Sequence, residues 1–89
     1  MIEKNITITN KLGLHARAAS KLVNCASSFA SEVWVKREER EVNGKSIMGV
    51  LMLAASKGTA LIIRVEGEDE EQAMAALEHL ITTKFGEDE

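Results

Sequence analysis

The sequence contains little of what usually cross-links or rigidifies a small protein. Its 89 residues include no proline, no tyrosine, one cysteine and one tryptophan. A single cysteine cannot form an internal disulfide, and it has no zinc-like spacing with the two histidines, so we expect no metal site. No apolar run approaches the roughly 18 residues of a membrane span, and no secretory signal is visible. These absences favour a cytoplasmic protein without a membrane partner.

The composition that remains is typical of one folded unit. Apolar residues make up 45% and charged residues 28% of the chain, so we expect a single domain over residues 1–89. Residues 1–58 carry nine basic and five acidic side chains, whereas residues 59–89 carry two basic and nine acidic ones. The basic part favours an acidic partner or a phosphate. We expect no nucleic-acid partner, because the isoelectric point is about 5.4, aromatic residues are few and no Lys/Arg run exceeds two.

The apolar residues follow two periods along the chain. A period of two predicts four strands, at residues 6–9, 32–37, 40–43 and 61–66. Helical spacing predicts three helices, at residues 15–27, 47–53 and from about 70 to 84. The order βαββαβα favours an α+β fold, with helices on one face of a mainly antiparallel sheet.

Two further predictions concern the ends of the last helix. Asp69 followed by Gln72 predicts a capping box at its start. The acidic residues 86–89 (GEDE) are predicted to form a solvated, frayed end.

A histidine at the start of the first helix is the leading candidate for chemistry. Gly13 and Leu14 precede His15, and Arg17 follows two residues later. The first N–H groups of a helix, here those of residues 16–18, lack intrahelical partners and form an anion site. The partial positive charge at the helix start disfavours an imidazolium, so we expect a neutral His15 with one nucleophilic nitrogen. The alternative is an ordinary helix cap with a solvated Arg17.

The second candidate region is the short helix at residues 47–53. Ser46 precedes it and is predicted to be its N-cap. The helix is apolar on nearly every side, so some of its side chains must face outward, whereas Val50 and Leu53 are expected in the core. The candidates for this exposed patch are Ile47, Met48, Leu51 and Met52.

Two separated motifs, Gly13–Arg17 (GLHAR) and Asn43–Val50 (NGKSIMGV), resemble those of the histidine-containing phosphocarrier (HPr) family. The resemblance extends over nearly the whole chain. It implies an open-faced β-sandwich, in which a four-stranded antiparallel sheet carries three helices on one face. It further implies a phosphoryl carrier rather than an enzyme, acting without a cofactor.

The resemblance also implies roles for particular residues. His15 would accept a phosphoryl group from Enzyme I, at Nδ1 as is usual in the family, and pass it to a IIA-type protein. Arg17 would assist, with the backbone of Ala16, Arg17 and Ala18 binding the phosphate. In part of the family an HPr kinase/phosphorylase phosphorylates the serine at the position of Ser46, and here both that role and a purely structural cap remain open. The first and the short helix would bind partners through Ser20, Ile47, Met48 and Leu51.

One position departs from the family pattern. Ala18 stands where the family usually has proline, which adds one backbone donor and relaxes the start of the helix. We expect phosphoryl transfer to survive this change. The sequence is similar to proteobacterial carriers of the nitrogen-regulatory branch, so its place in sugar transport is open.

Two other functions compete with the carrier. One is a regulatory docking module controlled through Ser46, whose binding would survive His15→Ala. The other is a small hydrolase with His15 as general base, which ranks last because no orienting acid lies near the histidine in sequence. A carrier that presents one small face to successive partners is expected to be a monomer.

Overall fold

The computed structural model describes residues 1–89 and confirms the predicted order of elements. Four strands, three helices and one short 3₁₀ turn follow one another in this order: β1 (Ile2–Thr7), α1 (Ala16–Ser27), β2 (Glu32–Arg37), β3 (Arg40–Asn43), α2 (Ile47–Met52), β4 (Ala60–Glu66), α3 (Glu70–Thr82) and η1 (Lys84–Gly86). The main difference in extent is β1, which begins at Ile2 rather than near residue 6. Its first half reads as polar because only one residue of the strand is buried.

The strands form one antiparallel sheet in the order β1-β4-β2-β3. Side chains along a strand point alternately to the two faces of the sheet. Val33 and Val35 are buried on one face, while Trp34 between them lies partly exposed on the opposite face. On that outer face the Arg64 guanidinium stacks over Trp34, with its carbon 5.7 Å from the ring centroid. The predicted α+β fold, with an antiparallel sheet covered on one side, is therefore confirmed.

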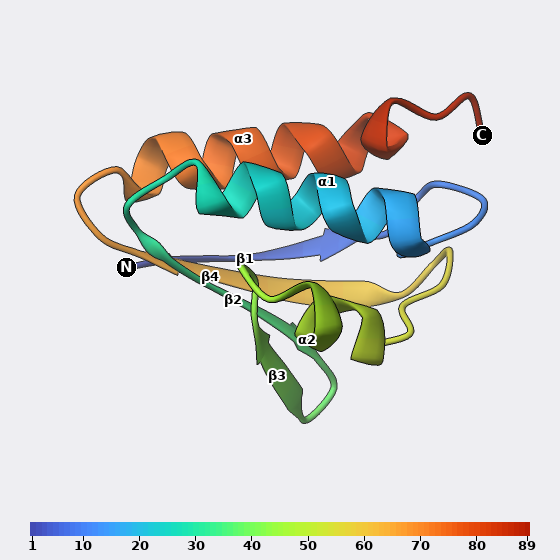
Figure 1. Ribbon diagram of the computed structural model, residues 1–89, viewed down its shortest axis with the longest axis horizontal. Coiled ribbons are helices and arrows are strands. Elements are labelled where there is room, and N and C mark those ends of the chain that lie inside the picture. Colours follow the sequence, from blue (N-terminus) through green and yellow to red (C-terminus); the bar gives the residue numbers. More distant parts are fainter.

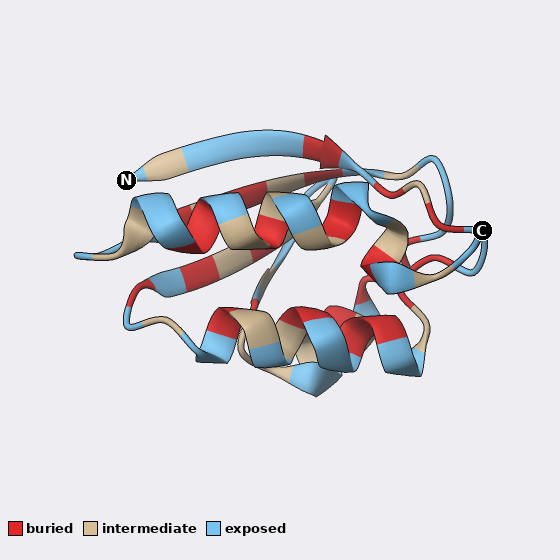
Figure 2. Ribbon diagram, turned by 90° about the horizontal axis from the view of Figure 1, so that it is seen from above, coloured by how far each residue is buried: buried red, intermediate tan, exposed pale blue.

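The helices cover the buried face of the sheet. Figure 1 shows α1 and α3 side by side above it, while α2 packs against α1 and β3. Buried residues recur along α1 and α3 between exposed ones (Figure 2). A single cluster of 20 buried residues joins the layers, with Leu22, Ile63 and Leu77 fully enclosed. Burying each such side chain contributes roughly 1.5–3 kcal/mol.

The loop between β1 and α1 is fixed to the segment that precedes β4. Leu14 N–H donates to the Ala55 carbonyl at 2.8 Å, and Ile8 N–H donates to the Thr59 carbonyl at 2.9 Å. Gly13 has a positive φ of 65°, and a Cβ there would lie 2.4 Å from the Ala55 oxygen. Only glycine fits this approach, so the loop delivers His15 to the start of α1 in one position.

The capping box predicted at the start of α3 is wrong. Asp69 is the N-cap residue, but its side chain makes no hydrogen bond to α3. Its carboxylate instead accepts from Ala30 N–H at 2.8 Å, Ser31 N–H at 2.9 Å and the Ser31 hydroxyl at 2.5 Å. The loop between α1 and β2 offers these donors beside the helix start, and three donors stabilise a carboxylate better than one.

The solvated tail predicted for residues 86–89 is wrong for Glu87. The chain turns through η1, where Phe85 is 1% exposed and anchors the segment in the core. Lys11 N–H then donates to the Glu89 carbonyl at 2.8 Å. The C-terminal residues therefore lie against the β1–α1 loop, at the same end of the molecule (Figure 1). No helix has the length and apolar character needed to cross a bilayer.

Candidate functional site

His15 is the N-cap residue of α1. Its backbone is extended, with φ −72° and ψ 175°, and its carbonyl accepts the first helical bond, from Ala19 N–H at 2.8 Å. Its imidazole makes no capping bond, so the ring does not occupy the donors of the first turn. Those donors belong to Ala16, Arg17 and Ala18, and they are the N–H groups that a helix leaves without a carbonyl partner. The expected histidine beside a row of backbone donors is thus present.

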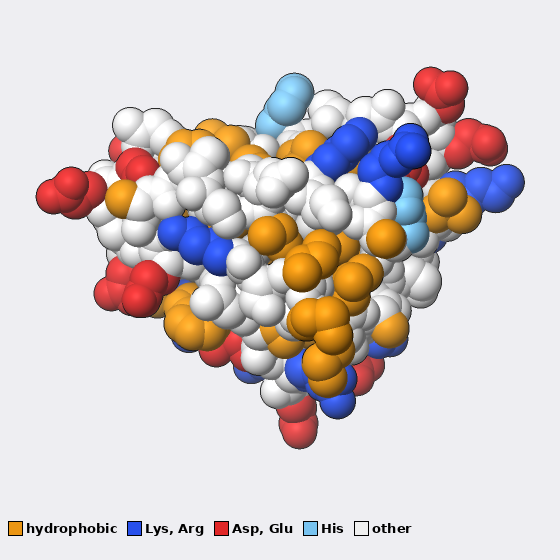
Figure 3. All heavy atoms as spheres, viewed as in Figure 1, with side chains coloured by type: hydrophobic (Ala, Val, Ile, Leu, Met, Phe, Trp, Pro, Cys, Tyr) orange, Lys and Arg blue, Asp and Glu red, His pale blue; other side chains and the backbone are white.

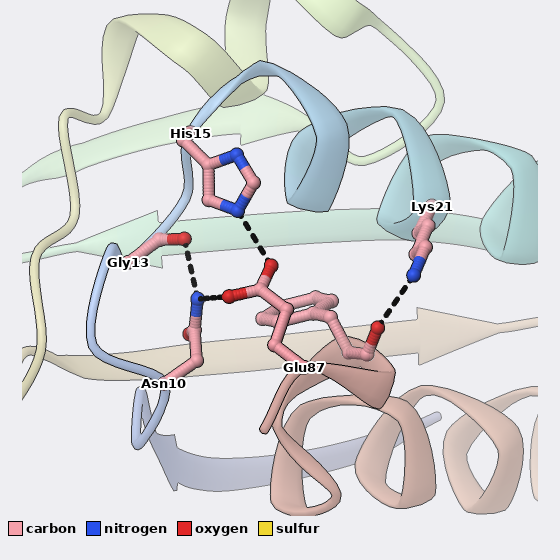
Figure 4. Close-up of polar contacts among 6 residues, drawn as sticks. Asn10, Gly13, His15, Lys21 and Glu87 are labelled. Atoms are coloured by element: carbon pink, nitrogen blue, oxygen red, sulfur yellow. Dashed lines mark hydrogen bonds and ion pairs between the residues drawn. The ribbon is translucent and has the colours of Figure 1, made fainter. Parts of the chain in front are cut away.

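The imidazole of His15 contacts the C-terminal tail. Its Nε2 lies 2.5 Å from Glu87 Oε2, and the other carboxylate oxygen, Oε1, accepts from Asn10 Nδ2 at 3.1 Å. Asn10 Nδ2 also donates to the Gly13 carbonyl at 2.8 Å. Figure 4 shows these side chains meeting between the β1–α1 loop and the tail. Three residues from two distant parts of the chain therefore form one polar cluster.

The charge state of Glu87 decides which ring nitrogen carries a proton. The hydrogen bond from His15 holds the pKa of the Glu87 carboxyl below its usual value, and the hydrogen bond from Asn10 and the nearby Lys21 charge act in the same direction. An ionised carboxylate only accepts hydrogen bonds, so Nε2 must be the donor. In a neutral ring Nδ1 then has the free electron pair, and it lies on the side of the ring away from Glu87 (Figure 4).

A lysine of α1 holds the C-terminal tail next to His15 through a hydrogen bond to the backbone. Lys21 Nζ donates to the Phe85 carbonyl at 2.7 Å, across the gap between α1 and η1 (Figure 4). The positive φ of Lys84 and Phe85, 59° and 56°, turns the backbone so that the next residue but one reaches His15. The contact between His15 and Glu87 thus depends on α1, η1 and the tail together.

The hollow in front of His15 is lined by charges of both signs, with Glu87, Asp88 and Glu89 of the tail on its acidic side. Arg17 and Lys11 are exposed and line the hollow in front of His15, together with Leu12. On the face shown in Figure 3, a band of apolar side chains lies beside Lys and Arg side chains. The α2 contribution is as predicted, with Met48 67% exposed, Ile47 37% exposed and Leu51 half-buried. Val50 and Leu53 are in the core, also as predicted.

The second motif is close to α1 but separate from the histidine cluster. Ser46 is the N-cap of α2, and its hydroxyl oxygen accepts from Gly49 N–H at 3.2 Å, which confirms the predicted cap. Ser20 is exposed on α1, the helix against which α2 packs. The predicted partner residues thus lie on two adjoining helices.

The sequence motifs do not identify Asn10 or Glu87 as part of the site. Asn10 lies outside both motifs, and Glu87 lies in the tail that is predicted to be solvated. The absence of an acid near His15, which counted against a hydrolase, holds only along the sequence, because the fold supplies Glu87. The available signal was Phe85, since a large apolar residue close to the tail predicts that the tail is anchored.

Comparisons with known proteins agree on one family. A family model described as "PTS HPr component phosphorylation site" matches residues 2–83. The phosphocarrier protein HPr of Neisseria meningitidis is 55% identical over 89 residues, covering all of both chains. That of Pseudomonas aeruginosa is 55% identical over 85 residues, 94% of each chain.

Solved structures agree with this result. The crystal structure of HPr-C-His from Thermoanaerobacter tengcongensis is similar with a TM-score of 0.97 and 48% identity, covering 100% of both chains. A phosphocarrier protein HPr from Bacillus anthracis follows with a TM-score of 0.87 and 35% identity, covering 90% of this chain and 95% of the other.

Proposed function

Because this chain belongs to the HPr family of phosphocarrier proteins of the phosphotransferase system, we propose that His15 is the residue that carries its phosphoryl group. The protein is a non-enzymatic phosphoryl carrier, and its family implies Enzyme I and IIA proteins as partners. One observation supports His15 above all. The histidine of the first motif stands at the start of α1 with Nδ1 directed away from Glu87 and the helix donors unused by its side chain.

The proposed transfer needs no proton movement at the attacking nitrogen. The electron pair of Nδ1 forms a bond to phosphorus while the bond between phosphorus and the donor histidine of Enzyme I breaks, and that pair returns to the donor ring. Backbone N–H groups of residues 16–18 and the Arg17 guanidinium bind the phosphoryl oxygens. Ala18 supplies one N–H that a proline would lack. The same steps in reverse order pass the group to a IIA-type protein.

The proposed partner surface consists of Ser20, Ile47, Met48 and Leu51. Exposed apolar side chains on α2 supply contact area, and Arg17 and Lys21 add positive charge on the neighbouring helix α1. Such a surface favours acidic partners and fast, short-lived complexes. We further propose that the carrier works in the cytoplasm as a single-domain monomer, a form that leaves its one small face open to successive partners.

We propose Ser46 as a second, regulatory phosphorylation site for a kinase of the HPr kinase/phosphorylase type. Its hydroxyl is half-buried at the N-terminus of α2, where the oxygen accepts one backbone N–H. A phosphate there would stay close to helix donors and would repel an acidic partner. The alternative is that Ser46 only caps the helix.

Labelling with phosphoenolpyruvate and a cognate Enzyme I tests the His15 assignment. Intact mass should show one acid-labile phosphate on the wild type and none on His15→Ala, whereas His79→Ala, a change at the exposed histidine of α3, should keep the label. No adduct on folded wild type, with an Enzyme I active on another carrier, would contradict the proposal. The regulatory docking module would then be favoured, provided that His15→Ala still binds its targets.

A further inference from the structure

The residue with the shortest contact to the His15 ring lies outside both family motifs. Glu87 reaches Nε2 from the C-terminal tail, 72 positions along the chain, and its side chain is only 19% exposed. Each of its carboxylate oxygens has one donor, since Oε2 faces His15 and Oε1 faces Asn10. The carboxylate is therefore fixed at both ends and has one orientation relative to the ring.

We propose that Glu87 is a positioning residue for phosphoryl transfer: held by Asn10, it keeps the proton of His15 on Nε2 and offsets the positive charge that the ring acquires when Nδ1 is phosphorylated. The inference rests on the carrier function proposed above. It assigns a role to a residue that the sequence motifs do not include.

The orientation of Asn10 supports this assignment. Its amide faces two oxygens, the Gly13 carbonyl and Glu87 Oε1, so the NH₂ end and not the carbonyl end must point toward them. Asn10 is 0% exposed, and its Oδ1 has no hydrogen-bond partner. A buried polar atom without a partner costs free energy. Here that cost falls on Oδ1, because the Nδ2 group faces both the Gly13 carbonyl and the Glu87 carboxylate. Asn10 thereby joins the loop that positions His15 to the carboxylate that contacts it.

The charge balance of the transfer explains what Glu87 contributes. When the neutral Nδ1 forms its bond to phosphorus, Nε2 keeps its hydrogen and the ring gains a positive charge shared between the two nitrogens. Glu87 Oε2, 2.5 Å from Nε2, stabilises that charge without taking the proton. On hand-over the Nδ1–P bond breaks, its electron pair returns to Nδ1, and the ring leaves as the neutral Nε2–H form. Glu87 therefore acts on the ring and does not touch the phosphoryl group.

The negative charge of Glu87 also repels the phosphoryl oxygens, but this effect is the weaker one. The phosphoryl group would bind at Nδ1, on the side of the ring away from Glu87 (Figure 4). His15 is the N-cap of α1, so the N–H groups of the first turn follow it directly in the chain. Coulomb energy falls with distance, and a direct hydrogen bond between charged groups exceeds a longer repulsion across a ring. The net effect of Glu87 is thus to stabilise the phosphorylated carrier.

The first test reads the ring of the unphosphorylated protein. We expect ¹⁵N NMR of His15 at mildly alkaline pH to show a protonated Nε2 and an unprotonated Nδ1, and we expect shifts averaged between tautomers in Glu87→Ala. Glu87→Gln keeps the shape of the side chain and controls for loss of the tail. A wild-type ring with its proton on Nδ1, or with the same averaged shifts as Glu87→Ala, would overturn the inference.

The second test measures the equilibrium of phosphoryl exchange with Enzyme I. Glu87→Gln should lower the equilibrium constant for phosphoryl transfer from Enzyme I to the carrier by about tenfold. This is the effect of losing one partly exposed charged hydrogen bond. Glu89→Gln removes the same charge from the same tail, but its side chain is exposed and 3.9 Å from Lys11, so we expect a change within about twofold. Equal losses in both variants, or no loss in Glu87→Gln, would contradict the role of the contact.

The two tests separate this inference from the function on which it rests. Absence of a phosphoryl group on wild-type His15 would remove the carrier assignment for that residue, whatever the ring NMR shows. Normal phosphorylation of wild type with an unchanged equilibrium in Glu87→Gln would keep the carrier and remove Glu87 from its mechanism.

Discussion

Asp69 at the start of α3 accepts three hydrogen bonds from the loop that leads into β2, two of them from Ser31. The Ser31 hydroxyl has the largest effect and, with the N–H groups of Ala30 and Ser31, holds the pKa of the Asp69 carboxyl below its usual value. Ser31 is 1% exposed, so its N–H and hydroxyl would be difficult for water to satisfy. Asp69 therefore joins two segments that are separate in sequence, and its ionised form is the one that does so.

Asp69→Asn should lower stability at neutral pH, because an amide cannot accept from all three donors. A carboxyl with a lowered pKa in the folded state contributes stability above its unfolded pKa, near 3.8, and loses it as the pH falls through the lower, folded pKa. The difference between wild type and variant should therefore shrink below about pH 4. Urea unfolding across this pH range measures it.

The matched control for Asp69 is Glu68→Gln, which removes the same charge from a neighbouring exposed residue. Its stability should match that of the wild type at neutral pH. A stability gap between wild type and Asp69→Asn that stays constant down to pH 2 would show that ionised Asp69 is not what joins the segments.

Ser46→Ala should destabilise the protein by about 1 kcal/mol, the usual effect of losing an N-cap acceptor. Its oxygen is the partner of Gly49 N–H in a helix of only six residues, so α2 depends strongly on it. Ser46→Asp keeps an acceptor at the cap and should retain most of the stability. Thermal unfolding compares them, with about 4–8 °C expected per kcal/mol in a domain of this size. Equal losses in both variants would mean that the cap is not the cause.

The predicted and the missed features differ in the range of the interactions that produce them. The boundaries of β2, β3 and α2 follow from patterns within a few residues, such as the alternation around Trp34 or the cap at Ser46. The place of His15 at a helix start is equally local, because the glycine-bearing loop and the apolar spacing flank it directly.

The contact between His15 and Glu87 is not local. It requires the register of the sheet, the packing of α3 on α1 and the turn at Phe85 before the tail can reach the loop. The failed capping box has a similar cause, since a competing loop supplied donors that no window around Asp69 contains. Tertiary packing thus selects the hydrogen-bond partners of His15 and Asp69, which the local sequence does not distinguish from others.

Gly13→Ala should disturb the site through the loop that holds His15. The residue has a left-handed backbone, and its new Cβ would lie 2.4 Å from the Ala55 carbonyl oxygen. Left-handed strain and overpacking together predict a loss of about 2 kcal/mol or more. Chemical denaturation measures the loss, and ¹⁵N NMR of His15 reports whether the ring leaves Glu87. Gly58→Ala is the control, because its φ is also positive but its Cβ would contact nothing. Similar losses in both variants would assign the cost to backbone strain alone.

Met48→Asp should weaken docking to Enzyme I without affecting the fold. The side chain is 67% exposed on α2, so the free energy of unfolding should change by less than about 0.5 kcal/mol. On the proposed partner surface, however, it replaces apolar contact area by a charge that an acidic partner repels. The KM for the carrier in the Enzyme I reaction should rise about tenfold or more, and added salt should recover part of this loss.

Met52→Asp tests where the proposed partner surface ends. Met52 is 59% exposed on the same helix, at its C-terminal end, where Arg40 Nη1 donates to its carbonyl at 3.2 Å. Met52→Asp introduces the same charge as Met48→Asp, but Met52 lies outside the residues proposed to contact partners. Its KM should therefore rise much less than that of Met48→Asp. If the two variants weaken docking equally, the surface extends along the whole of α2, and if neither does, α2 does not contact Enzyme I.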